Sequence, residues 1–361
     1  MAAMTRRAGI AWAGVVLALL AIAAATAWNL TPWPKALLVR HAFNAGGEAS
    51  AQALARHVPA GIGEIRGLAY REGDRDARLD VFFPETAARA GARLPAVVWV
   101  HGGGWVAGDR AHGANYLRIL ASHGYTTVAI GYAIAPEHHY PLPVVQTNAA
   151  LGYLVENAAR LHIDPQRIVL AGDSAGAQIA AQVATLTTSP AYAQALGIAP
   201  TLAPGQLRAT VLACGAYDLS VIDAGGDYAD FLRTVLWAYS GTRDFRDDPR
   251  VALASITPQV TAEFPPSFIT AGNGDPLEPQ SRALAARLDA LGVRTDALFF
   301  PPARTPALPH EYQFNLDDPA GREALARIVG FLDATVGHGT PAAAAAGAQT
   351  AITPGDAADG Q

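Results

Sequence analysis

The segment Gly172-Asp173-Ser174-Ala175-Gly176 lies between an apolar run at residues 168–171 and an apolar stretch at residues 177–186. The first run has the length of a buried strand, and the second has the composition of a helix. A serine on a sharp turn between a strand and a helix needs small neighbours, because adjacent chains pass close to it. The pattern therefore predicts that Ser174 is a nucleophile at the edge of a sheet, with a tight structural turn as the alternative.

Short apolar runs recur along the middle of the chain, and most are bounded by Gly, Pro or Asp. They lie at residues 96–100, 126–130, 168–171, 209–213, 267–271 and 294–300. Helical segments separate several of them, and a last helix is predicted over residues 321–336. Residues 65–70 and 78–83 are predicted to pair as antiparallel strands. This alternation predicts an α/β fold with a mainly parallel sheet, helices on both faces and a site at the carboxyl ends of the strands.

Three consecutive glycines follow the run at residues 96–100, within His101-Gly102-Gly103-Gly104-Trp105. Glycines at this position expose backbone N–H groups, which are the donors that hold the oxyanion of an acyl-transfer reaction. We expect the amides of Gly102, Gly103, Gly104 and Ala175 to form this oxyanion hole. A flexible turn is the alternative, and His101 is interpreted as a structural residue of the loop.

A serine hydroxyl needs a base to accept its proton and an acid to hold that base. Asp275 follows the run at residues 267–271, and His310 follows the run at residues 294–300. The order Ser174, Asp275, His310 is the order of an α/β-hydrolase triad. Surface positions are the alternatives for Asp275 and His310. The competing histidines are less suitable, because His138 and His139 precede the serine and His338 lies near the C-terminus.

These motifs, with Gly131-Tyr132-Ala133-Ile134-Ala135-Pro136-Glu137-His138 and Asp275-Pro276-Leu277, resemble α/β-hydrolase esterases of the hormone-sensitive-lipase and feruloyl-esterase-like groups. The resemblance covers about residues 65–336. It implies an α/β-hydrolase fold and a serine carboxylesterase that hydrolyses short acyl esters through an acyl-enzyme, without cofactor or metal. Ala133 departs from the family, which usually has Arg there, and the proline-rich residues 301–309 lengthen the loop before His310.

Residues 218–263 separate two strands and carry an amphipathic helix pattern. This segment is either a small cap over the site or a helix packed on the sheet. If it is a cap, Trp105, Tyr217 and Trp237 are candidates for the substrate pocket. The sequence does not identify the ester.

The first 30 residues have the character of an export or anchoring segment. Residues 8–27 are almost entirely apolar, and Arg6 and Arg7 precede them. This length spans a bilayer, and the arginines would stay in the cytoplasm. We expect a signal-anchor or, through Ala25-Thr26-Ala27, a cleaved signal peptide, with a buried core helix as the third reading. Residues 31–337 are then an extracytoplasmic catalytic domain, and residues 338–361 are an Ala/Gly/Pro-rich disordered tail.

The composition argues against several classes of protein. There are 26 basic and 31 acidic residues, so the formal net charge is −5, which makes nucleic acid an unlikely partner. The single cysteine, Cys214, allows no intramolecular disulfide and no cysteine-cluster metal site, and it is interpreted as a buried, inert thiol. Two alternatives to an esterase stay open, namely another serine hydrolase (amidase, formamidase or peptidase) and a non-catalytic anchored binding protein. Oligomeric state is not readable from the sequence.

Overall fold

Eight strands form one mixed sheet in the computed structural model, which describes residues 2–221 and 227–338. Their order is β1-β2-β4-β3-β5-β6-β7-β8, where β2 is antiparallel to β1 and β4 and all other neighbours are parallel. The strands are β1 (Ile62–Ala69), β2 (Arg78–Pro84), β3 (Leu94–Val100), β4 (Thr126–Ile130), β5 (Ile163–Asp173), β6 (Leu207–Ala213), β7 (Ser267–Ala271) and β8 (Thr295–Phe299). The predicted mainly parallel sheet and its antiparallel lead-in are confirmed.

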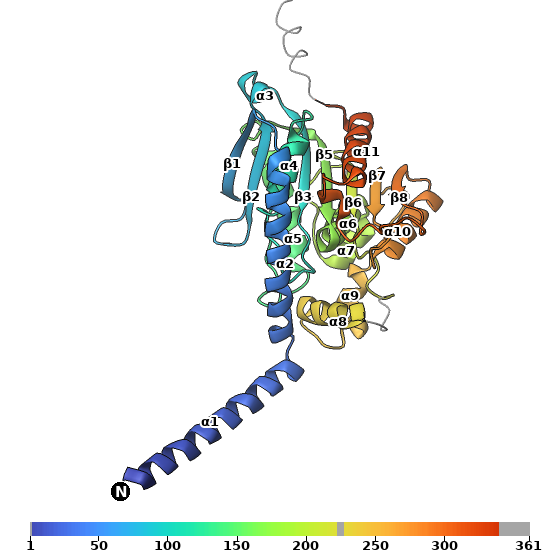
Figure 1. The fold of residues 1–361 in the computed structure, drawn as a ribbon. Coiled ribbons are helices and arrows are strands. Elements are labelled where there is room, and N and C mark those ends of the chain that lie inside the picture. The colour runs from blue at the N-terminus through green and yellow to red at the C-terminus, as the bar shows by residue number, and fades with distance from the viewer. Residues whose placement is uncertain (1, 222–226, 339–361) are drawn as a thin grey trace, which may run out of the picture.

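Helices cover both faces of the sheet (Figure 1). They are α1 (Ala2–Leu30), α2 (Trp33–Leu54), α3 (Glu85–Arg89), α4 (Ala114–Ala121), α5 (Leu142–Glu156), α6 (Ser174–Thr188), α7 (Pro190–Leu196), α8 (Asp227–Ser240), α9 (Pro249–Ala254), α10 (Glu278–Ala290) and α11 (Pro319–Val336). Alternate residues of β3 point to opposite faces, as the two-residue period of a strand requires. Val98 packs in the core with α5, α6 and α10, and Trp99 packs in the core with α4 and α11.

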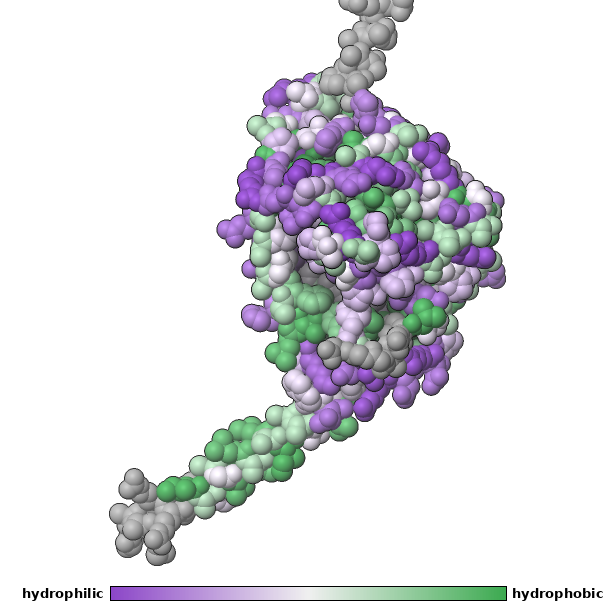
Figure 2. All heavy atoms as spheres, turned by 45° about the vertical axis from the view of Figure 1, so that its right-hand side comes forward, coloured by the Kyte–Doolittle hydropathy of each residue, from purple (hydrophilic) through white to green (hydrophobic). Residues whose placement is uncertain are grey.

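The N-terminal helix α1 projects from the body (Figure 1). Ile10–Leu30 is long and apolar enough to cross a membrane, and none of it is buried in the structure. Figure 2 shows hydrophobic residues along α1 and a mixed surface on the body. The reading as a buried core helix does not fit this placement.

The helix α2 has no counterpart among the helices that the sequence pattern predicts. Its side chains bond to the segment that follows the three glycines. Arg40 donates to the carbonyl oxygens of Val106 at 2.7 Å and Ala135 at 2.6 Å, and it pairs with Glu137 at 2.6 Å. Only Ala36 and Leu54 of α2 are buried, and Gly46-Gly47 interrupts its apolar residues, so polar bonds rather than a buried apolar stripe fix this helix to the body.

The segment at residues 218–263 contains α8 and α9, and α8 packs against α2 as well as the glycine loop. Residues 222–226 of this segment lie outside the described residues. So does the predicted disordered tail, apart from His338.

Candidate active site

Ser174 lies at the turn from β5 into α6, and its backbone has a φ of 51°. This left-handed conformation is strained for a residue with a side chain. Both flanking glycines are sterically required. A Cβ on Gly176 would lie 2.1 Å from the carbonyl oxygen of Val100, and a Cβ on Gly172 would lie 2.6 Å from the carbonyl carbon of Gly176. The turn can therefore form only with glycine at these two positions.

The structure brings Ser174, His310 and Asp275 together in one chain of hydrogen bonds. Ser174 Oγ is 3.0 Å from His310 Nε2, and His310 Nδ1 is 2.9 Å from Asp275 Oδ2. With the Nδ1 proton donated to Asp275, Nε2 is free to accept the hydroxyl proton of Ser174. The other carboxylate oxygen of Asp275 accepts the backbone N–H of Leu277 at 2.8 Å, which fixes the acid in place.

The long loop before His310 is tied to the segment that follows β7. Asn273 Oδ1 accepts the N–H of Leu308 at 2.9 Å, and Asn273 Nδ2 donates to the carbonyl of Arg304 at 3.0 Å. The N–H of Gly274 donates to the carbonyl of Leu308 at 2.9 Å. Asn273 is a positioning residue that sequence reasoning missed, although its place between two glycines beside Asp275 is a usable signal.

The electrostatics of His310 favour the charged imidazolium. Burial by itself lowers the pKa of His310, but the hydrogen-bonded Asp275 carboxylate and the nearby Glu311 raise it, and the net pKa is above the usual value. Glu311 Oε1 is 3.8 Å from His310 Nε2. An imidazolium is the species that forms when His310 accepts a proton, so this environment suits a general base.

A second carboxyl group, Asp173, is buried behind the serine. It accepts the indole N–H of Trp99 at 2.6 Å and the backbone N–H of Gly102 at 2.8 Å. Burial and the neighbouring Glu311 raise the pKa of Asp173 well above its usual value. Because the Gly102 amide already donates to Asp173, it is not free to bind an oxyanion, which corrects the prediction for Gly102.

The remaining oxyanion candidates are the amides of Gly103, Gly104 and Ala175. Gly103 has a φ of 117° and its Cβ position is blocked 2.2 Å away by the carbonyl oxygen of Ala107, so glycine is obligatory there. Within the part of the chain that the structure describes, the N–H groups of Gly103 and Gly104 have no acceptor. Ala175 lies in the first turn of α6, where N–H groups lack helical partners and the helix dipole favours negative charge.

His101 has a structural position, as the sequence predicts. Its ring stacks on Tyr132 with a centroid distance of 4.3 Å, and the Tyr132 hydroxyl donates to the His101 carbonyl at 2.7 Å. Burial lowers the pKa of His101 to about 4, so the ring is neutral near pH 7. These contacts fix the start of the glycine loop.

Cys214 is fully buried beside the same residues. Its sulfur, a carboxylate oxygen of Asp275 and a ring nitrogen of His310 lie within 4.8 Å of one another. These are metal-ligating atom types, but the Asp275 and His310 atoms already bond to each other and to Ser174. Burial raises the pKa of Cys214 to about 11, so its thiol is neutral and poorly reactive near pH 7.

Two of the three pocket candidates are core residues. Trp105 is 2% exposed, with its ring stacked on Tyr239 at 5.0 Å and its N–H directed at Gln178. Tyr217 is fully buried, and its hydroxyl finds no partner among the described residues. Neither ring presents a surface to a substrate in this structure.

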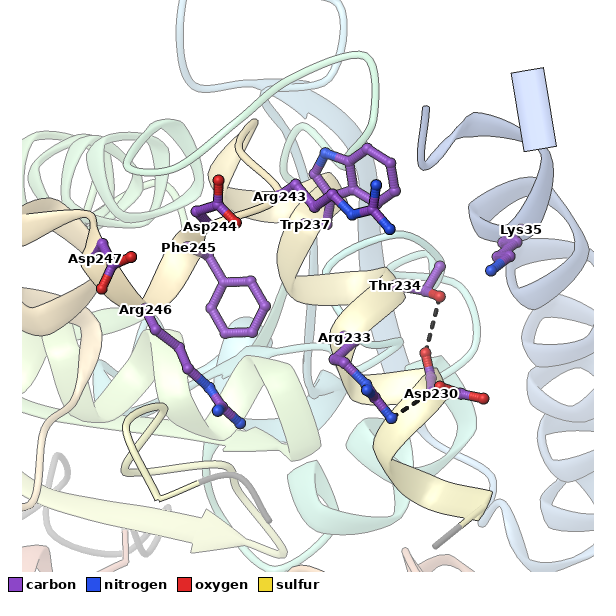
Figure 3. A pocket seen from close by; sticks show the side chains of 10 residues that line it. All are labelled: Lys35, Asp230, Arg233, Thr234, Trp237, Arg243, Asp244, Phe245, Arg246 and Asp247. Carbon is purple, nitrogen blue, oxygen red and sulfur yellow. Dashed lines mark hydrogen bonds and ion pairs between the residues drawn. The ribbon is translucent and has the colours of Figure 1, made fainter. Parts of the chain in front are cut away.

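The third candidate, Trp237, lines a cavity whose lining includes no residue of the triad. This cavity has a volume of about 500 Å³ and lies between α2 and α8 (Figure 3). The residues near the glycine loop are instead Phe231 and Val235, whose side chains lie 3.4 and 3.5 Å from the Cβ position of Gly104. Because residues four apart share a helix face and residues two apart do not, the face that carries Phe231 and Val235 excludes Trp237.

A second cavity, of about 440 Å³, adjoins the acid of the triad. Its lining includes Val221, Tyr228, Leu232, Pro276 and Leu277. Tyr228 also packs on Phe231 with a centroid distance of 5.2 Å. The cavity therefore lies between α8 and the segment that begins with Asp275.

Comparison with known proteins agrees with this geometry. A family model described as an alpha/beta hydrolase fold matches residues 97–311, which is more than half of the chain. The chain therefore belongs to the α/β-hydrolase fold family.

Several similar proteins are named as esterases. Carboxylesterase NlhH of Mycobacterium tuberculosis is 33% identical over 281 residues, covering 73% of this chain and 80% of the relative. An acetyl esterase of Salmonella paratyphi B is 29% identical over 228 residues, covering 60% and 64%. The solved structure of esterase B from Lactobacillus rhamnosis, inhibited by a tributyrin phosphonate, superimposes with a TM-score of 0.72 and 25% identity, covering 84% of this chain and 96% of that one. The chain is an ester-hydrolysing α/β-hydrolase of the hormone-sensitive-lipase-like group.

Proposed function

We propose that the protein is a serine carboxylesterase that uses Ser174 as nucleophile, His310 as general base and acid, and Asp275 as the residue that orients His310. The observation that carries the proposal is the continuous hydrogen-bonded chain from Ser174 Oγ through His310 to Asp275. The backbone amides of Gly103 and Gly104, which have no acceptor among the described residues, add the oxyanion donors. This combination supplies both a base for the serine and donors for the oxyanion.

The reaction proceeds in two halves. Ser174 Oγ attacks the ester carbonyl carbon while His310 Nε2 takes the hydroxyl proton, and the amides of Gly103, Gly104 and Ala175 hold the oxyanion. Collapse of this intermediate breaks the bond to the alcohol, which leaves with the proton from His310. Water then gives a proton to His310, attacks the acyl-enzyme and releases the carboxylic acid, and the proton returns to Ser174.

Short acyl esters are the proposed substrates. Phe231 and Val235 lie close over Gly104, and the cavity beside Asp275 has a volume of only about 440 Å³. The relatives named as an acetyl esterase and as an esterase inhibited by a tributyrin phosphonate support small acyl groups for this chain too.

The proposed location is outside the cytoplasm, with α1 as a signal-anchor or a cleaved signal peptide. The support is the exposed apolar helix Ile10–Leu30, together with the two arginines that precede it. In the anchored form, the catalytic residues lie beyond the outer surface of the membrane.

Hydrolysis of a series of nitrophenyl esters from acetyl to dodecanoyl tests the chemistry. We expect turnover to be greatest for short chains, and we expect His310→Ala to lower kcat/KM by about 10³-fold or more. Asp275→Asn should lower it by a similar factor, whereas Asp289→Asn, at an exposed aspartate of α10, serves as the matched control.

A matched nitroanilide separates the alternatives. Cleavage of the anilide with negligible ester turnover would indicate an amidase or peptidase. The absence of turnover on both series would favour a binding protein and contradict the proposal.

A further inference from the structure

The junction between α1 and α2 is short, and contacts connect the residues on its two sides. Only Thr31 and Pro32 separate the two helices. The Thr31 N–H donates to the carbonyl of Ala27 at 3.1 Å, and Lys35 Nζ lies 5.7 Å from the ring centroid of Trp28, across the junction. The body therefore begins directly where the apolar helix ends, without a flexible linker.

The exposed hydrophobic side chains gather at this end of the molecule. Among the described residues, every large hydrophobic residue that is more than 40% exposed belongs to α1 or α2, apart from Val221. From residue 28 onward in these two helices, they are Trp28, Leu30, Trp33, Leu37, Leu38 and Phe43. Leu38 is 59% exposed, although it lies one turn into a helix of the body.

These positions match the dimensions of a bilayer. Ile10–Leu30 has 21 residues, and at 1.5 Å per residue it spans about 31 Å, close to the thickness of the hydrocarbon core. Leu30 then lies at the edge of the hydrocarbon. Trp33, Leu37 and Leu38 follow within about 12 Å of helix, near the headgroup layer, where tryptophan is enriched.

Charged groups surround the same junction. The cavity of about 500 Å³ between α2 and α8 is lined by Lys35, Arg243 and Trp237, with Asp230 and Asp244 among its acidic residues. Figure 3 shows Lys35 on α2 facing α8. The Arg243 guanidinium lies over the Trp237 ring at 5.4 Å. Basic and indole side chains together are typical of a surface at headgroup level.

The same two helices reach the catalytic residues. Phe43 of α2 packs against Phe231 of α8 with a centroid distance of 5.4 Å, and Phe231 lies over Gly104. Asn44 accepts the N–H of Gly108 at 2.9 Å, so α2 is fixed to the glycine loop. Figure 1 shows α8 beside the first turns of α2, next to the end of α1.

We propose that the α2 and α8 end of the body docks on the bilayer surface and that the enzyme takes small amphiphilic esters from the headgroup layer of the membrane that holds α1. This inference rests on the proposed esterase function and on retention of α1. It assigns the exposed Trp33, Leu37 and Leu38 to lipid contact. The substrate class is an ester with a short acyl chain on an alcohol that partitions into the bilayer interface.

The first test measures lipid contact independently of catalysis. Leu38→Cys in the full chain, reconstituted in phosphatidylcholine and phosphatidylglycerol vesicles, is labelled with an environment-sensitive fluorophore, since the native Cys214 is fully buried. The matched control is Ala334→Cys, an exposed residue of α11, which lies at the other end of the body from α1 (Figure 1). Lipid-borne quenchers near the headgroups should quench the label at residue 38 and not at residue 334. Equal quenching at both residues, or at neither, would overturn the docking.

The second test compares two substrates. The variant L37E/L38E should lower kcat/KM about tenfold on nitrophenyl hexanoate loaded into the vesicles and leave the water-soluble nitrophenyl acetate within about twofold. The control A326E/A334E adds the same charges on α11 and should change neither. A loss on both esters, or on neither, would contradict uptake from the bilayer. If the wild type cleaves neither ester, the proposed function fails, and the quenching test still decides the docking.

Discussion

Glu311 provides a quantitative test of how the site supports its base. Its Oε1 atom is 3.8 Å from His310 Nε2, and its side chain is 36% exposed. Coulomb's law gives about 4 kcal/mol for unit charges at this distance with an effective dielectric constant of about 20, and about 1 kcal/mol in bulk water. Because solvent screens a partly exposed carboxylate, we take about 1–2 kcal/mol, which is roughly one pKa unit.

Glu311→Gln removes this charge without changing the shape of the side chain. The carboxylate raises the pKa of His310, so its removal lowers that pKa, and the neutral base persists to lower pH. The acidic limb of the kcat/KM profile for a short ester should therefore move down by roughly one pH unit. The plateau at higher pH should fall by up to about tenfold, because the transition state contains the imidazolium.

The assay is kcat/KM for nitrophenyl acetate between pH 5 and 9, with Glu156→Gln, an exposed residue of α5, as the matched control. An acidic limb that stays in place in Glu311→Gln, while Asp275→Asn moves it, would refute the coupling of Glu311 to His310.

Three further outcomes follow from packing and burial. Gly176→Ala places a Cβ 2.1 Å from a carbonyl oxygen and should lower the free energy of unfolding, measured by urea titration, by more than about 3 kcal/mol. Gly330→Ala, with no atom within 4 Å of the new Cβ, should raise it by about 0.5–1 kcal/mol. Equal effects of the two substitutions would contradict the steric account. Cys214, fully buried and with a pKa raised to about 11, should resist maleimide at pH 7.5 until the protein is unfolded, and rapid labelling of the native state would contradict its placement. Arg40→Gln removes the ion pair to Glu137 and should cost about 1–3 kcal/mol in the same titrations, and an unchanged midpoint would show that α2 is held by other contacts.

The sheet and the catalytic constellation were predictable because each part has a local signal. Apolar runs bounded by Gly, Pro or Asp located the strands, and the chain order of Ser174, Asp275 and His310 placed all three at one sheet edge. The steric need for Gly172 and Gly176 is visible in the sequence, since only glycine tolerates such close backbone approach.

Other features depend on contacts between distant segments, which no local pattern reveals. The Gly102 amide is engaged by Asp173, a contact across 71 positions that removed one predicted oxyanion donor. The helix α2 has a weak apolar pattern, because Arg40 and Asn44 fix it through polar bonds. Trp237 and Phe231 belong to one amphipathic pattern, and the packing of α8 shows that Phe231 lies over the glycine loop whereas Trp237 lines another cavity.

Covalent trapping of the nucleophile tests the central claim most directly. The wild-type protein is treated with a short-chain alkyl phosphonate and examined by intact and peptide mass spectrometry, alongside Ser174→Ala. The account predicts one adduct per chain on the peptide that contains Ser174, lost together with ester hydrolysis in Ser174→Ala. An adduct on another residue, or hydrolysis of nitrophenyl acetate by Ser174→Ala at the wild-type rate, would contradict it.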